Sequence, residues 1–116
     1  MNGEKKGVGV RVDPSTWSVA EWKKVATSYT TADRLICNTP CFLLSVLATG
    51  YHDDNGEIKI YDGQGAIGDP KYHVRTAARV SFFLDFSVPV YFGRGLYLDI
   101  VDKCDAVTIQ YLPWNP

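Results

Sequence analysis

Turn-forming residues recur so often along this chain that little room is left for a long helix. Glycine, proline, asparagine and aspartate break the 116 residues into short apolar or alternating stretches. Stretches of this kind, bounded by turn signals, are typical of β-strands. Aromatic residues make up 13% of the chain and also favour strands. We therefore predict an all-β domain, an antiparallel β-sandwich or jelly roll of about seven to eight short strands.

Hydrophobic periodicity locates the individual strands. Ser18 and Glu21 have the spacing of a helix capping box, so one helical turn before the strand expected at residues 23–30 is the open alternative. The last strand closes the domain. The strands are expected at residues 8–12, 23–30, 42–49, 57–61, 79–92, 96–100 and 106–112.

Three local features refine this prediction. The stretch 42–49 is apolar on both sides, with Phe42, Leu44, Val46 and Ala48 on one side and Leu43 and Leu47 on the other, which indicates a strand covered on both faces. Asn55-Gly56 predicts a tight hairpin turn because both positions of such a turn need positive φ. Pro89 cannot donate to a ladder, so it is expected at a sheet edge or a bend.

The interior and the main loop can also be assigned. Val80, Phe82, Leu84 and Phe86 are expected to face inward, with Phe83 on the outer face. Truncating Phe82 or Leu98 to alanine should therefore cost on the order of 2–5 kcal/mol. The loop from Asp62 to Tyr72 contains three glycines and is expected to be mobile and tolerant of change.

Charge and composition exclude several classes of partner. Twelve basic residues face thirteen acidic ones, so nothing indicates nucleic-acid binding. The longest apolar stretch, around residues 41–48, is far shorter than the roughly 20 residues that span a bilayer. The start of the chain lacks the apolar run of a signal peptide, so we expect synthesis in a cytoplasm, with no membrane partner.

The residues that could carry chemistry do not form a recognisable site. Cys37, Cys41 and Cys104 are odd in number and, with His52 and His73, match no zinc pattern, so reduced thiols and no metal are expected. The acidic stretch 52–57 lacks the alternating ligands of a calcium loop.

Two further motifs are also negative. Residues 63–68 read G-x-G-x-x-G, but they precede Asp69-Pro70 and strand-like sequence, so they are interpreted as a hairpin loop and not a phosphate site. No nucleophile motif is present. The prediction is no catalytic residue, no cofactor and no enzyme.

Two segments of the chain resemble known proteins. These are Glu57-Ile58-Lys59-Ile60-Tyr61-Asp62-Gly63 and Tyr91-Phe92-Gly93-Arg94-Gly95-Leu96-Tyr97-Leu98. With the closing Val107-Thr108-Ile109-Gln110-Tyr111, they resemble small β-sandwich structural proteins of tailed bacteriophages, over about residues 35 to 112. The resemblance implies a capsid decoration protein or a subunit of a head fibre or tail, located in the virion, and it defines no functional residues.

The functional expectation follows from this resemblance and from the apolar residues outside it. We expect a virion structural protein that assembles with itself, a trimer being one arrangement, and with other virion proteins. Residues 1–22 are expected to form an intersubunit arm and residues 23–116 the sandwich. The candidate assembly contacts are Val8, Val10, Val12, Trp17, Trp22 and Trp114. The alternative is a carbohydrate-binding module that holds a glycan on an exposed aromatic pair; a small sandwich enzyme with a cleft is the third hypothesis.

Overall fold

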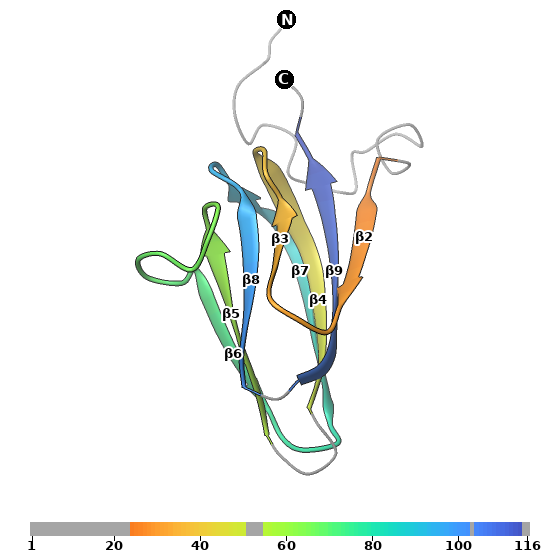
Figure 1. Cartoon of the computed structure of the whole chain (residues 1–116). Coiled ribbons are helices and arrows are strands. Elements are labelled where there is room, and N and C mark those ends of the chain that lie inside the picture. The colour runs from red at the N-terminus through yellow and green to blue at the C-terminus, as the bar shows by residue number, and fades with distance from the viewer. Residues whose placement is uncertain (1–23, 51–54, 103, 115–116) are drawn as a thin grey trace, which may run out of the picture.

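The chain folds into two antiparallel sheets packed face to face (Figure 1). The computed structural model describes residues 24–50, 55–102 and 104–114. In these residues one sheet has the strand order β2-β9-β4-β7 and the other the order β3-β8-β5-β6. The strands are β2 Ala26–Thr30, β3 Arg34–Cys37, β4 Cys41–Gly50, β5 Gly56–Asp62, β6 Tyr72–Thr76, β7 Ser81–Phe92, β8 Leu96–Asp102 and β9 Cys104–Pro113. The predicted all-β sandwich is confirmed.

The main core lies between the two sheets and is built by alternation along each strand. Alternate side chains are fully buried in part of each of three strands, as expected for strands with one face inward: Ile58 and Ile60 in β5, Leu96 and Leu98 in β8, and Val107 and Ile109 in β9. Both sheets contribute to one contiguous cluster. Its largest fully buried side chains are Leu43, Ile58, Ile60, Phe92, Leu96, Leu98 and Ile109.

Residues 41–46 of β4 are buried on both faces, as predicted, but Leu47 is 38% exposed and the division of the side chains differs from the prediction. Leu43 shares the main core with Val46, whereas Phe42 and Leu44 lie in a second cluster on the outer side of the sheet. The cause is a bulge between Leu43 and Ser45 that shifts the register with both neighbouring strands. A bulge inserts one extra residue and reverses the alternation beyond it.

The predicted Asn55-Gly56 hairpin is wrong, because β4 and β5 belong to different sheets. Neither Asn55 nor Gly56 is among the described residues with positive φ. The Asn55 side-chain oxygen instead accepts a hydrogen bond from the Ala78 backbone N–H at 3.1 Å, and Gly56 pairs with Thr76. The connection therefore crosses between the sheets and is fixed to the β6–β7 turn.

Strand β7 confirms that Pro89 lies at a sheet edge. It also shows that the residues predicted to face inward are only partly buried. Pro89 lies in the edge strand of its sheet, within the stretch where the register with β4 shifts. Leu84 and Phe86 pack against the core, but Val80 is 51% exposed and Phe82 37%. An edge strand has a neighbour on one side only, which leaves its end uncovered.

Candidate functional site

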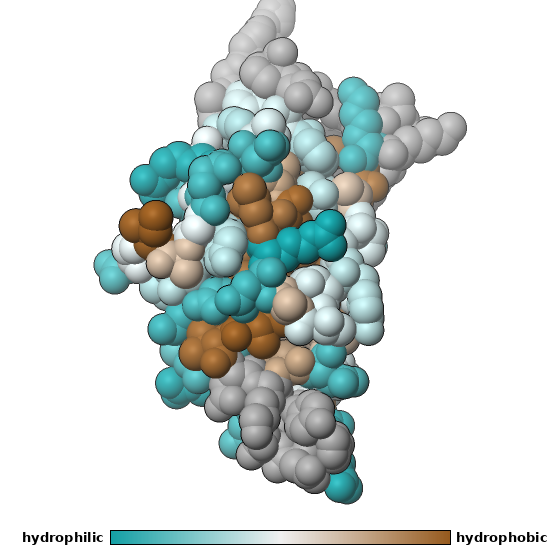
Figure 2. All heavy atoms as spheres, in the orientation of Figure 1, coloured by the Kyte–Doolittle hydropathy of each residue, from teal (hydrophilic) through white to brown (hydrophobic). Residues whose placement is uncertain are grey.

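The two outward faces of the sandwich differ sharply in charge. On the β3-β8-β5-β6 sheet, Lys59 lies between Asp99 and His73, and Glu57 lies opposite Arg75. The Glu57 carboxylate contacts the His73 ring and lies 3.6 Å from the Arg75 guanidinium. The His73 hydrogen bond holds the pKa of Glu57 below its usual value. Figure 2 looks onto this face, where hydrophilic side chains separate the apolar patches.

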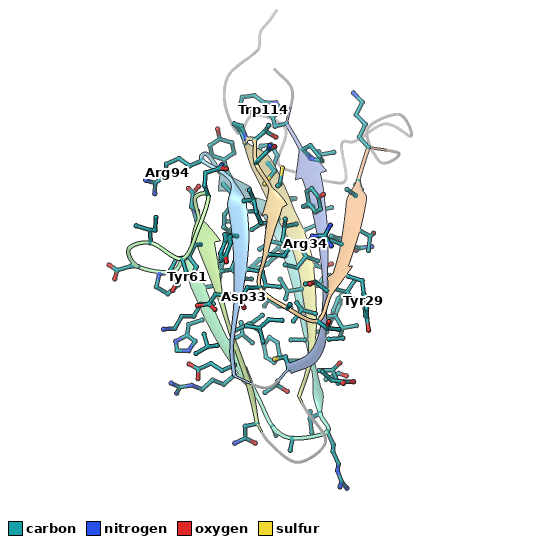
Figure 3. All side chains as sticks on the ribbon, in the orientation of Figure 1. Tyr29, Asp33, Arg34, Tyr61, Arg94 and Trp114 are labelled. Carbon is teal, nitrogen blue, oxygen red and sulfur yellow. The ribbon has the colours of Figure 1, made fainter. Side chains whose placement is uncertain are left out.

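The outward face of the other sheet is almost uncharged. Its central row, read across the four strands by register, is Tyr29, Thr108, Leu47 and Phe83. Tyr29 is 64% exposed, Leu47 38% and Phe83 60%. We call these four residues the neutral row. Figure 3 shows Tyr29 projecting from β2 away from the other strands.

The two rows on either side of the neutral row are polar, and together they contain one charged side chain. The first consists of Thr27, Gln110, Ser45 and Asp85. The second consists of Ala106, Thr49 and Ser81. Two side-chain hydrogen bonds cross the strands here, one from the Ser45 hydroxyl to the Gln110 carbonyl oxygen at 3.0 Å and one between the Thr49 and Ser81 hydroxyls at 3.0 Å. The single carboxylate, Asp85, lies on the edge strand β7.

Trp114 is the one predicted assembly contact that the structure describes. Its ring packs edge-on against Tyr91 and Phe42, with ring centroids 5.8 Å and 6.2 Å away. Its backbone N–H donates to the Pro40 carbonyl oxygen at 2.9 Å. Val25 and Leu112 complete the cluster. Trp114 is half-buried among residues of its own chain, and a role in assembly stays a prediction. Val8, Val10, Val12, Trp17 and Trp22 lie outside the described residues.

The two motifs that carry the phage resemblance meet at one end of the sandwich. Asp62, which ends β5, accepts hydrogen bonds from the backbone N–H groups of Gly93 (3.3 Å) and Arg94 (2.8 Å). The Gln64 amide donates to the Arg94 carbonyl oxygen at 2.6 Å and to the Asn38 carbonyl oxygen at 3.2 Å. The motifs thus form one structural unit that ties three turns together.

This hydrogen-bond network bears on the prediction that the 62–72 loop is mobile and tolerant of change. The loop joins the antiparallel strands β5 and β6, so the interpretation of its glycine motif as a hairpin loop is confirmed. Lys71, at its far end, donates to the Tyr91 carbonyl oxygen at 3.0 Å. Both ends of the loop are therefore fixed, and tolerance to change is expected only at the tip, where Ile67 is 84% exposed.

A shallow groove of about 340 Å³ opens between β3 and the end of β9, the size of a small ligand site. Its aromatic residue is Tyr111, and Asn38 and Thr39 supply polar atoms. The ring pairs of the described residues meet at angles between 49° and 83°. A coplanar pair, which the glycan-binding alternative requires, is not among them.

The groups that could carry chemistry are dispersed in the described part of the chain. Cys37, Cys41 and Cys104 are buried free thiols, and burial raises the pKa of Cys41 far above its usual value. Desolvation and the neighbouring Asp33 raise the pKa of Asp99 on the charged face. Within residues 24–50, 55–102 and 104–114, no group of three potential metal ligands comes together. The acidic stretch 52–57 lies partly outside the described residues, so the prediction that it is not a calcium loop is untested.

Comparison with known proteins does not assign the chain to a family. No protein-family model and no curated protein matches the chain. The coat protein of Tobacco streak virus is a structural neighbour with 11% sequence identity and a TM-score of 0.32, covering 85% of this chain and 95% of that one. Within the described residues, no helix is long and apolar enough to cross a membrane. Function therefore has to be argued from the surfaces described above.

Sequence reasoning missed the neutral row. Phe83 was expected on the outer face, but Leu47 was taken as one of two residues on the second face of its strand and Tyr29 as part of an ambiguous segment. The alternation of each strand carried the signal. Aligning the strands requires the register, which the bulge in β4 alters.

Proposed function

We propose that this chain is a virion structural protein of a tailed bacteriophage, a capsid decoration or head or tail accessory subunit that assembles in several copies. The proposal assigns it no catalytic role. Its localisation is the virion, after synthesis in the host cytoplasm. The resemblance of the two motifs suggests the class of protein, and the surface of the sandwich supports assembly.

The observation that carries the proposal is the neutral, partly apolar outer face of the β2-β9-β4-β7 sheet. Large contiguous apolar patches are rare on monomeric soluble proteins and mark interaction sites where they occur. The core of an interface is depleted of charge and enriched in aromatic residues. Tyr29 and Phe83 are each at least 60% exposed on this face, and the charged side chains are concentrated on the other sheet.

Two rival functions lack comparable support. A carbohydrate-binding module would use a platform of coplanar rings, whereas the described rings of Phe42, Tyr91 and Trp114 pack edge-on or tilted against one another. An enzyme would gather perturbed titratable groups in a cleft. Asp99 and Cys41 instead lie on an outer face and in the core.

The experiment that tests the proposal compares the mass of the purified chain in solution with its copy number on intact phage particles. A structural subunit should be found on purified particles in a fixed number of copies. A chain that is absent from particles, or that binds a glycan array with the particles absent, would overturn the virion assignment.

The predicted arm is tested in the same assay by deleting residues 1–15. If the arm serves assembly, the truncated chain should keep a nearly unchanged melting temperature and lose binding to particles or to other copies. Loss of the folded state would show that the segment belongs to its own sandwich. A truncated chain that folds and still assembles would refute the arm.

A further inference from the structure

We infer that the outer face of the β2-β9-β4-β7 sheet binds a second copy of this chain, face to face about a twofold axis. The inference rests on the proposed function for the identity of the partner and goes beyond it in naming the surface and the arrangement. The binding surface that we assign is the outer face of the sandwich that contains the neutral row.

The near absence of charge on this face favours a partner surface that is also uncharged. The three central rows of this face contain one ionisable carboxylate, Asp85, placed at the edge. A strongly acidic or basic partner, such as nucleic acid, would find no opposite charges here. The face is instead rich in hydroxyl, amide, aliphatic and aromatic groups, which can be buried against a surface of the same kind. Among the surfaces of the described residues, the outer face of the β2-β9-β4-β7 sheet has this composition, so the same face of a second copy is a matching partner.

The order of side chains along the neutral row makes it self-complementary. Aromatic residues, Tyr29 and Phe83, occupy its two ends, and the smaller Thr108 and Leu47 lie between them. A half-turn about an axis parallel to the strands reverses the row. It then places Tyr29 of one copy opposite Phe83 of the second copy, and Thr108 opposite Leu47.

The polar row next to it is compatible with the same half-turn. Its order is Thr27, Gln110, Ser45 and Asp85. Reversal brings Asp85 opposite the Thr27 hydroxyl of the second copy, so no carboxylate faces another. A hydroxyl can donate a hydrogen bond to a carboxylate. Two aligned sheets pack at roughly 30° in known sandwiches, which keeps these rows in register near the axis.

The area available predicts a weak contact. Four strands about 4.8 Å apart and three outward rows about 7 Å apart give a projected area of about 400 Å² per copy. Two copies bury about 800 Å² in projection and more once side-chain relief is included, which is below the roughly 1,200–2,000 Å² of stable interfaces and in the range of weak, transient ones. Such a contact is expected to be concentration-dependent in solution and to be strengthened when copies are held together on a particle.

The test measures self-association of the full chain by sedimentation over a wide range of concentration. Tyr29→Lys and Phe83→Asp should each weaken association by at least about tenfold, since each buries an unpaired charge costing more than about 1.4 kcal/mol. Mixing these two variant chains should restore association above that of either alone, because the half-turn places the two changed positions opposite each other. The matched control, Val101→Lys, alters a side chain 44% exposed on the other sheet and should have no effect.

The outcomes separate this inference from the proposed function. Because Tyr29 and Phe83 are mostly exposed, both variants should keep the parental melting temperature, which verifies folding; Thr108→Lys is the substitute if one does not. Association that survives all of them, or that only Val101→Lys disrupts, would overturn the face and leave the virion role standing. A parent chain that stays monomeric yet binds particles would overturn the second copy as occupant. A chain that does neither would overturn both.

Discussion

Gly95, in the turn between β7 and β8, combines a left-handed backbone conformation with close neighbours, and both disfavour a side chain at this position. Its φ is +131°, a region that L-residues rarely adopt. A Cβ there would lie 2.7 Å from the Gln64 side-chain nitrogen, 2.8 Å from the Gly63 carbonyl oxygen and 3.0 Å from the Cys37 carbonyl oxygen. Two of these neighbours are backbone atoms, so the methyl group cannot be accommodated by moving a side chain alone.

The expected cost of Gly95→Ala is the sum of three effects. The backbone conformation costs about 1–3 kcal/mol for a residue with a Cβ. Displacing close-packed neighbours costs about 1–3 kcal/mol more. Weakening the hydrogen bond from the Gly63 N–H to the Gly95 carbonyl oxygen, now 3.1 Å, costs about 0.5–1.5 kcal/mol. We therefore expect a loss of about 2.5–7.5 kcal/mol in the free energy of unfolding.

Gly68 provides the matched control. Its φ is +78°, but nothing lies within 4 Å of the position that a Cβ would occupy. Gly68→Ala should cost only the left-handed strain of about 1–2 kcal/mol, partly offset by the reduced entropy of the unfolded chain. Chemical denaturation of both variants measures the difference, expected to be about 3 kcal/mol. Equal stabilities of the two variants would refute the argument that the Gln64–Arg94 network closes around Gly95.

Three further predictions concern the core, pH and the loop. Leu98→Ala should lower the free energy of unfolding by about 2–5 kcal/mol, whereas Phe82→Ala should cost clearly less because that ring is 37% exposed; denaturant midpoints compare them. The pKa of Asp99 is raised by desolvation and Asp33, so its charge opposes folding at neutral pH and the fold gains stability as pH falls through that pKa. Asp99→Asn should therefore raise the melting temperature at neutral pH, with an advantage that shrinks towards about pH 4; an advantage independent of pH would contradict this. Deleting residues 65–68 should shift the melting temperature little, since loop entropy varies slowly with length, and cooperative loss of the fold would show that the tip is structural.

Alternation and turn chemistry were sufficient to predict the class of fold from the sequence. They located the strands β2, β4, β5, β7, β8 and β9 and placed Pro89 at an edge, because these properties depend on neighbouring residues alone. The short strands β3 (Arg34–Cys37) and β6 (Tyr72–Thr76) were missed. Pairing between strands was less accessible. Asn55-Gly56 has the sequence of a hairpin turn, yet the chain uses it to change sheets, since the Asn55 side chain bonds to Ala78. A turn motif specifies local geometry and says little about which strand comes next in the sheet.

The side chains of β4 show a second limit of prediction. Leu43 and Val46 are three residues apart and would point to opposite sides of a regular strand, but both lie in the main core because a bulge separates them. Such a bulge depends on the neighbouring strands β7 and β9, which come much later in the chain. The tertiary contacts of the edge strand likewise decide how much of Phe82 is covered.

The neutral row could not be predicted from the sequence either, because it depends on the register between strands that are far apart in the chain. Tyr29, Leu47, Phe83 and Thr108 belong to four separate strands, and an isolated exposed apolar residue is ordinary on any protein surface. Only the register makes them neighbours. The same register places Glu57, Lys59, His73, Arg75 and Asp99 together on the opposite sheet. The sandwich therefore has one face that favours hydration and one that favours contact. Substitutions of equally exposed apolar residues should then affect association according to the face that they occupy, because the cost of adding a charge depends on whether water or a second surface covers it.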